Sequence, residues 1–290
     1  MNALFEWGSY LTYSALWRLV RLLPEKLAYR IFDLLAEVAY RRNGRRVTRL
    51  RENYKRVRPN LSNDELETMV RAGLKNAMRY WCDTFRISDW SPEQAAQRVI
   101  STNEELLHEG MKSGKGVIIA VPHAGNWDHA GAYFCATGIP LTTVAEHLEP
   151  EKLFKKFLTY RENIGMEVLD LNSRSIATLS QRARAGKLIA LVADRDISNN
   201  GVPVEFCRAD AKLPAGPALL AIQTGAALIT AYIRYEVEGI RIIFGPEILV
   251  PNTGDVSQKV KFMTQEIANR FGAQLQKDPV DWHMLQRIWA

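Results

Sequence analysis

Cysteine is scarce in this sequence, and its spacing excludes two classes of protein. The three cysteines, Cys82, Cys135 and Cys207, lie far apart and include no CxxC pair. Pairing any two of them leaves one over, so a disulfide framework and a cysteine zinc site are both disfavoured. This usage is typical of a chain that stays reduced in the cytosol.

Long uncharged apolar runs are also lacking. The most apolar stretch, residues 4–23, is interrupted by Glu6, Arg18 and Arg21. It therefore falls short of the roughly 18 uncharged residues that a membrane-spanning helix needs. Its internal charges and the missing small-residue cleavage site also argue against a signal peptide.

Several catalytic motifs are missing too. The sequence contains no HExxH, no GxSxG and no GxGxxG between a predicted strand and a helix, which disfavours zincins, hydrolases with a nucleophile elbow and dinucleotide-binding proteins. The segment "GMKSGKG", residues 110–116, resembles a P-loop but is one residue too short, and no Ser or Thr follows Lys115. We interpret it as a turn before a strand.

What is present predicts a single α/β domain. Hydrophobic residues make up 47% of the 290 positions, enough for a substantial core. Helical periodicity covers 4–23 and 24–43, the second with an apolar face, and "SNDE" (62–65) is a capping box that opens a third helix. From there β-rich runs alternate with helical ones, at 116–121, 141–146, 167–171, 187–194, 227–236 and 241–245. The alternation predicts a largely parallel sheet flanked by helices at 61–290, preceded by a helical segment at 1–60.

Positive charge is concentrated near the start of the chain. Residues 41–58 hold nine Lys or Arg and one acidic residue, so their net charge of +8 exceeds the +6 of the whole chain. A solvated helix surface and a face for anionic lipid headgroups both explain this run. Nucleic acid is less favoured because no binding module accompanies it. Aromatic residues in 4–23 suit a membrane interface, although core packing explains them equally.

Chemically unusual residues follow three of the predicted strands. His123 follows 116–121, Glu146 ends 141–146, and Asp194 ends 187–194 and precedes Arg195 and Asp196. Ligands of such sheets gather at the carboxyl ends of the strands. We therefore expect a histidine and several carboxylates at one edge of the sheet.

The segment 121–131, "VPHAGNWDHAG", brings His123 and Asp128 together only if the chain turns between them. Gly125 permits such a turn, and Asn126 is a good cap for a helix that starts at Trp127. Backbone amides near Gly125 and Asn126 are then candidate donors for an oxyanion. The alternatives are a structural His123 and, less favoured, a metal site built from His123, His129 and His147.

No serine or cysteine is clearly placed as a nucleophile beside His123. The simplest remaining role for a histidine supported by a carboxylate is a general base that deprotonates a hydroxyl of the substrate. This role implies direct group transfer without a covalent enzyme intermediate.

These segments resemble a known family. "PHAGNWDHAG", "VAE", "YRENIG", "ADRDISNNGVPVEFCRADAKLPAGPALLAIQTGAALI" and "DPVDWHMLQRIW" are similar to the bacterial lipid A biosynthesis acyltransferases, and most of all to their actinobacterial phosphatidylinositol mannoside branch. The segment "CRADAKLP", residues 207–214, departs from the Phe-Gly type of loop expected in that family.

The resemblance implies a peripheral enzyme on the cytoplasmic face of the plasma membrane. It would carry a palmitoyl-type chain from acyl-CoA, as co-substrate, to a mannose 6-hydroxyl of an anionic glycolipid, with no other cofactor. The family's His-x4-acid motif maps onto His123 and Asp128, and its second acid onto Asp194, with Asp196 as a rival.

Three further residues complete the expectations for the site. The resemblance places Glu146 and Arg161 in the active-site groove. Arg161 or Arg195 suits phosphate or sugar oxygens because of its guanidinium geometry. The remaining functional alternatives are a non-catalytic lipid-binding protein and an acyl-CoA thioesterase.

Overall fold

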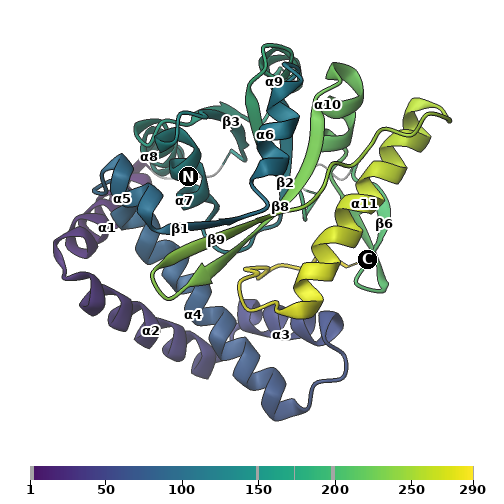
Figure 1. Cartoon of the computed structure of the whole chain (residues 1–290). Helices are drawn as coiled ribbons and strands as arrows, with labels where there is room; N and C mark the ends of the chain where they lie inside the picture. The colour runs from purple at the N-terminus through teal and green to yellow at the C-terminus, as the bar shows by residue number, and fades with distance from the viewer. Residues whose placement is uncertain (1–2, 148–149, 173, 197–199, 290) are drawn as a thin grey trace.

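The computed structural model describes residues 3–147, 150–172, 174–196 and 200–289. Its centre is a seven-stranded sheet in the order β1-β9-β8-β2-β5-β3-β4, accompanied by a separate hairpin, β6-β7 (Figure 1). The strands are β1 (Val99–Thr102), β2 (Val117–Val121), β3 (Leu141–Ala145), β4 (Glu167–Asp170), β5 (Leu188–Val192), β6 (Val202–Phe206), β7 (Ala209–Leu213), β8 (Ala227–Glu236) and β9 (Gly239–Phe244).

Helices precede the sheet and connect its strands. They are α1 (Ala3–Leu22), α2 (Glu25–Arg42), α3 (Arg45–Val57), α4 (Asn63–Ile87), α5 (Pro92–Gln97), α6 (Glu105–Lys112), α7 (Trp127–Ala136), α8 (Glu151–Asn163), α9 (Ser175–Arg184), α10 (Gly216–Thr224) and α11 (Val256–Lys277). The expected α/β class and helical start of the chain are confirmed, and the helical part continues past residue 60 through α4.

The sheet is parallel where the expected site lies. β2 pairs in parallel with both β5 and β8, and β3 with both β5 and β4. Among the described strands of this seven-stranded sheet, the one antiparallel pairing is that of β8 with β9. Strands β8, β2, β5, β3 and β4 therefore end at the same edge of the sheet, which we call the carboxyl edge.

Alternate residues of the central strand β2 enter two different cores. Ile118 and Ala120 pack in a cluster that includes residues of α9, α10 and α11. Ile119 and Val121 pack instead in a cluster with Ala130 and Phe134 of α7. All five residues of β2 are buried, which explains why its sequence is a continuous apolar run.

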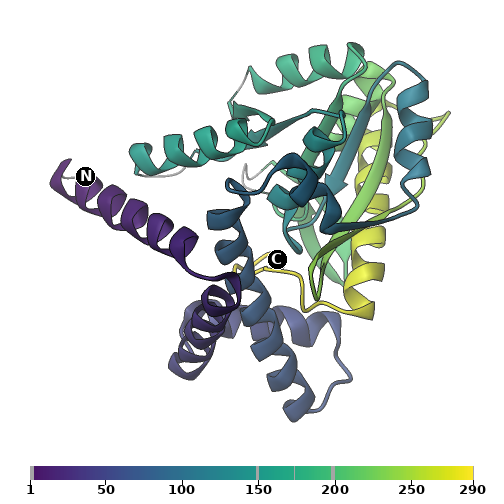
Figure 2. The same ribbon diagram turned by 60° about the vertical axis from the view of Figure 1, so that its left-hand side comes forward.

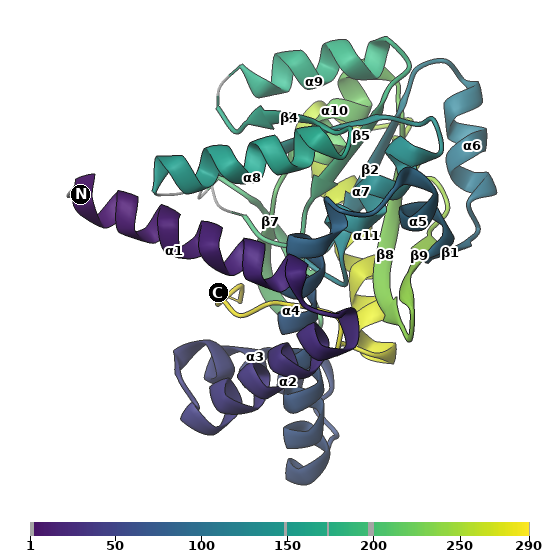
Figure 3. The same ribbon diagram turned by 90° about the vertical axis from the view of Figure 1, so that its left-hand side faces the viewer.

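The first two helices project from this α/β core, as Figures 2 and 3 show. α1 packs against α8 through Trp17, whose ring centroid lies 5.6 Å from that of Phe157. The predicted apolar face of α2 points outward: Leu34 is 63% exposed, whereas Ala28 and Phe32 are buried. No helix among the described residues is both long and apolar enough to span a bilayer.

Local sequence signals located most of the sheet. The six predicted β runs correspond to β2, β3, β4, β5, β8 and β9, and the capping boxes include the predicted one at Ser62 and Glu65. β1 and the β6-β7 hairpin were not predicted. The hairpin turn places Cys207 and Arg208 at positive φ (50° and 64°), a conformation that non-glycine sequences rarely signal.

Candidate active site

His123 and Asp194 form the centre of the candidate site. They follow the adjacent strands β2 and β5, where Val121 pairs with Val192, so the register brings them to the same point of the carboxyl edge. The His123 Nδ1 donates to Asp194 Oδ1 at 2.5 Å, and the His123 backbone N–H donates to Oδ2 at 2.9 Å. The contact leaves Nε2 of the partly exposed imidazole available to a substrate.

The Asp194 carboxylate is fully buried and has a third donor. The indole Nε1 of Trp282 donates to its Oδ2 at 2.8 Å. Burial raises the pKa of Asp194, but the charge of His123 and the hydrogen bonds from His123 and Trp282 outweigh burial and hold this pKa below its usual range. The carboxylate therefore stays ionised beside the imidazole.

The C-terminal segment holds the turn that carries His123. Residues 281–283 run antiparallel to 123–125, with an isolated bridge between Ala124 and Trp282. The His283 N–H donates to the His123 carbonyl oxygen at 2.8 Å, and the His283 Nε2 contacts the Gly125 carbonyl oxygen at 2.9 Å. Burial lowers the pKa of His283 to about 4, so this ring is neutral and its Nε2–H can donate to Gly125.

The pairing of residues 281–283 with 123–125 corrects the expectation that the Gly125 amide is a donor for an oxyanion. The Gly125 backbone N–H donates to the Asp281 carbonyl oxygen at 2.8 Å, so this amide is not available to an oxyanion in this conformation. Glycine is nevertheless required here because φ is +58° and a Cβ would lie 2.6 Å from the carbonyl oxygen of Ile233. Gly125 therefore shapes the turn.

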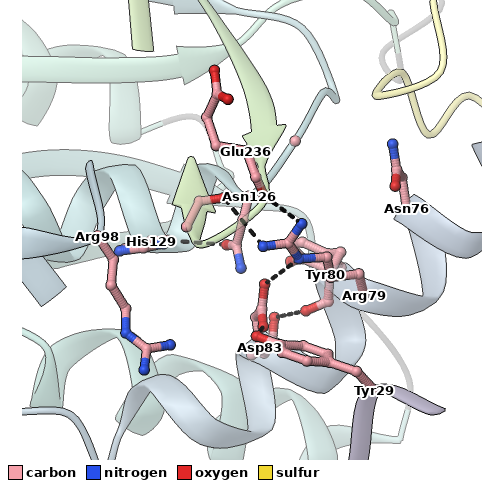
Figure 4. Close-up of polar contacts among 12 residues, drawn as sticks. Tyr29, Asn76, Arg79, Tyr80, Asp83, Arg98, Asn126, His129 and Glu236 are labelled. Carbon is pink, nitrogen blue, oxygen red and sulfur yellow. Dashed lines mark hydrogen bonds and ion pairs between the residues drawn. The ribbon is translucent and has the colours of Figure 1, made fainter. Parts of the chain in front are cut away.

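Asn126 caps α7, as the sequence predicted. Its Oδ1 accepts the His129 backbone N–H at 2.9 Å. Behind this cap lies a buried polar cluster (Figure 4), in which Tyr29 of α2 donates to Asp83 of α4 at 2.6 Å. Burial raises the pKa of Asp83 to about 6, although Arg79 opposes the shift. The cluster connects α2 and α4 to the start of α7.

Asp128 is buried and contacts Arg161. Arg161 Nε of α8 donates to its Oδ1 at 2.8 Å, and the Tyr80 hydroxyl donates to its Oδ2 at 2.9 Å. Burial lowers the pKa of Arg161, but the Asp128 carboxylate together with Tyr80 and Tyr160 outweighs burial, and the net change in this pKa is upward. Of the carboxylates considered for His123, Asp194 contacts its imidazole, whereas Asp128 binds Arg161 and Tyr80.

Glu146 and Arg195 meet at the carboxyl edge. Arg195 Nη2 donates to Glu146 Oε2 at 2.8 Å, and the same guanidinium contacts Gln286 Oε1. Asp196 lies one residue further along, and its Oδ2 accepts the Gly201 backbone N–H at 2.8 Å. That hydrogen bond joins Asp196, four residues after the end of β5, to Gly201 at the start of the hairpin.

The three histidines considered for a metal site have separate partners. His129 is buried, its Nε2 contacts the Ala95 carbonyl oxygen at 2.9 Å, and burial lowers its pKa to about 4. His147 Nε2 lies 2.9 Å from Glu151, whereas His123 binds Asp194. Within the described ranges, no three His, Cys, Asp or Glu side chains gather into a possible metal site.

An apolar pocket lies between α7 and the sheet, beside His123 and Asp194. It has a volume of about 620 Å³ including its open mouth, and Asp128 and Arg161 are among its few polar lining residues. Within it, the space that the centre of a water molecule can occupy is about 70 Å³. The apolar lining includes Ile119, Val121, Phe134, Leu141, Ala190 and Ile233.

Sequence reasoning missed Trp282, His283 and Tyr80 as parts of this site. Trp282 and His283 do belong to the C-terminal segment that carried part of the family resemblance. No local pattern, however, shows that a tryptophan 88 residues from Asp194 contacts it.

Comparison with known proteins supports the resemblance. The whole chain, residues 1–290, matches the family of bacterial lipid A biosynthesis acyltransferases. It is 38% identical over 282 residues to the phosphatidylinositol mannoside acyltransferase of Mycolicibacterium smegmatis, an alignment that covers 96% of this chain and 90% of that protein. The protein of the same name from Mycobacterium tuberculosis H37Rv is 36% identical over 282 residues, with 96% and 87% covered.

Proposed function

The chain belongs to the bacterial lipid A biosynthesis acyltransferase family and is an O-acyltransferase, and from this premise we propose its substrates and mechanism. The donor is an acyl-CoA with a palmitoyl-type chain. The acceptor is a mannose 6-hydroxyl of a phosphatidylinositol mannoside, as the names of the similar proteins suggest. The observation that carries the mechanism is the contact between His123 and the buried Asp194.

His123 acts as the general base in this proposal. Asp194 fixes the tautomer in which Nδ1 carries a proton and Nε2 is an acceptor. Nε2 takes the proton of the sugar hydroxyl while the hydroxyl oxygen attacks the thioester carbonyl carbon. The tetrahedral intermediate collapses, the C–S bond breaks, and coenzyme A leaves as the thiol with the proton returned by His123.

The surrounding polar residues bind the substrates. The Gly125 amide is bonded to the Asp281 carbonyl oxygen. The donor that stabilises the oxyanion is therefore the backbone amide of Asn126, at the start of α7. Glu146 and Arg195 bind sugar or phosphate oxygens at the carboxyl edge, and Asp196 lies beside them, bonded to Gly201. Arg161 and Asp128 mark the polar part of the pocket wall.

The apolar pocket receives the acyl chain. Its lining and its position under α7 suit a hydrocarbon chain whose thioester remains at the carboxyl edge. Burial of a long chain is favourable by roughly 0.8 kcal/mol for each CH₂ removed from water. The pocket should therefore make the enzyme prefer donors with a long acyl group over donors with a short one.

A membrane surface supplies the lipid acceptor. The outward apolar face of α2 includes Leu27, Leu34 and Leu35, all exposed, and the basic run of residues 41–58 covers α3 beside it. Such a pairing suits peripheral binding to an anionic surface. We place the enzyme on the cytoplasmic face of the plasma membrane.

One experiment tests the reaction and the base together. Purified protein and His123→Ala are incubated with palmitoyl-CoA and a phosphatidylinositol mannoside, and acylated glycolipid and free thiol are followed in parallel. We expect equal amounts of both products from the wild type and a loss of at least about 100-fold in the variant. Circular dichroism checks that the variant is folded.

Other outcomes separate the alternatives. Thiol release without acylated glycolipid identifies a thioesterase or a different acceptor. Lipid binding without any donor-dependent reaction identifies a non-catalytic binding protein. Near-normal turnover by His123→Ala rules out His123 as the base.

A further inference from the structure

The pocket under α7 has two chemically different ends. Val121 and Val192 are the last residues of β2 and β5, next to His123 and Asp194 at the carboxyl edge. Leu141 is the first residue of β3, and Met166 directly precedes β4. Because these strands are parallel, Leu141 and Met166 line the opposite end of the pocket, which we call its deep end.

Met166 lies directly against α7 at this deep end. A Cβ added to Gly131 would be 2.3 Å from Met166 Cε and 2.8 Å from its Sδ. The methionine side chain thus occupies the space that a side chain at position 131 would take. It is 6% exposed, and its backbone N–H donates to the Arg161 carbonyl oxygen at 3.1 Å, so the residue is anchored while its thioether remains adaptable.

We propose that Met166, packed on Gly131, closes the deep end of the pocket and sets the longest acyl chain that the enzyme accepts. The inference rests on the proposed function, in which this pocket holds the acyl chain of the donor. An extended chain that enters at the carboxyl edge meets the Met166 thioether after running along the length of β2 and β5. Shortening this side chain lengthens the pocket, and adding a methyl group at position 131 shortens it.

The test compares the donor chain lengths that matched variants accept. Initial rates are measured with a series from decanoyl- to eicosanoyl-CoA and the phosphatidylinositol mannoside acceptor. The quantity compared is kcat/KM for a donor two carbons longer than the wild-type optimum, divided by kcat/KM for the optimum donor. In Met166→Ala we expect this quotient to rise at least about tenfold. Gly131→Ala shifts the optimum to shorter chains, and Met166→Leu, which conserves volume, leaves it unchanged.

Met263→Ala is the matched control. It removes the same atoms from another buried methionine, but Met263 packs in the core cluster on the other face of the sheet. Its chain-length profile should equal that of the wild type even if its stability falls. A shift in Met263→Ala like that in Met166→Ala would show that loss of stability, and not pocket depth, changes the profile, and would overturn the inference.

Binding of free fatty acids provides a readout that needs no turnover. Trp127 lines the pocket, so its fluorescence can follow titration with the same series of chain lengths. An optimum that lengthens in Met166→Ala and shortens in Gly131→Ala supports the inference even if the acceptor is wrong. Unchanged optima in both variants overturn it, whereas absence of transfer by a wild-type protein that binds the chains contradicts only the proposed function.

Discussion

Asp194 contacts His123 at two points, with one carboxylate oxygen on the imidazole Nδ1 and the other on the backbone N–H of the same residue. Both the orientation of the ring and the position of the turn therefore depend on one buried carboxylate. Asp128, which stands at the spacing typical of the family motif, binds Arg161 and Tyr80 instead. The two aspartates consequently have different tasks.

Asn substitutions should separate these tasks. Asp194→Asn removes the acceptor that fixes the His123 tautomer, and we expect kcat to fall by about 10⁴-fold with the fold retained. Asp128→Asn leaves Arg161, whose side chain is 19% exposed, without its counter-ion, and we expect it to lower the free energy of unfolding by about 3 kcal/mol. Steady-state kinetics and urea unfolding measure the two effects. Equal kinetic and stability losses in both variants would contradict the division.

Trp282→Phe tests the third donor of Asp194. Without the indole N–H the pKa of Asp194 should rise, because this hydrogen bond favours the ionised form. The acid limb of the kcat/KM profile that protonation of Asp194 sets should then move to higher pH by about one to two units, since a hydrogen bond to a charged group is worth about 1.5–3 kcal/mol.

Trp289→Phe is the control for this variant. Its indole lies near Trp282 but donates to Asn53 Oδ1 at 3.0 Å. It should weaken packing without moving the acid limb. An identical shift in both variants would show that the effect comes from packing alone.

Asp281→Asn should change how stability depends on pH. Burial raises the pKa of Asp281 to about 7, above the value of about 3.9 in an unfolded chain. Between these values the folded protein retains a proton that the unfolded chain has released, so this residue makes the free energy of unfolding fall as pH rises. The neutral amide removes that decline.

The variant should therefore gain stability relative to the wild type between about pH 4 and pH 7, and gain nothing below this window. Thermal unfolding across the range measures the difference, with exposed Asp210→Asn as the control. A constant difference at every pH would argue against the raised pKa.

The outward face of α2 should govern binding to membranes. Leu34→Glu combined with Leu35→Glu places charge on two side chains that are 63% and 50% exposed. We expect sedimentation with phosphatidylinositol-containing vesicles to weaken at least about tenfold, because each leucine contributes about 1.5 kcal/mol or more when buried. Val237→Glu, at a hairpin turn and 95% exposed, is the control, and equal losses in both proteins would rule out α2 as the contact.

Local sequence patterns carried much of the fold. Continuous apolar runs such as 117–121 identified strands buried on both faces, and Ser62 and Asn126 marked helix starts because their side chains bond nearby amides. The hairpin β6-β7 was not predicted, although buried and exposed residues alternate in both strands, because each strand has only five residues and the turn at Cys207 and Arg208 contains no glycine. The exposure of Leu34 and Leu35 was also not predicted, because periodicity identifies an apolar helix face but does not show what covers that face.

Local patterns in the sequence were enough to show that His123 and Asp194 follow buried strands, and parallel strands place such residues at one edge. Which carboxylate meets the imidazole emerged from the folded chain, because this hydrogen bond depends on the register of β2 and β5 and joins residues 71 positions apart. It also decided that the Gly125 amide is bonded and that Trp282 reaches Asp194. These contacts arise when the C-terminal segment folds back over the carboxyl edge, an arrangement that no local periodicity encodes.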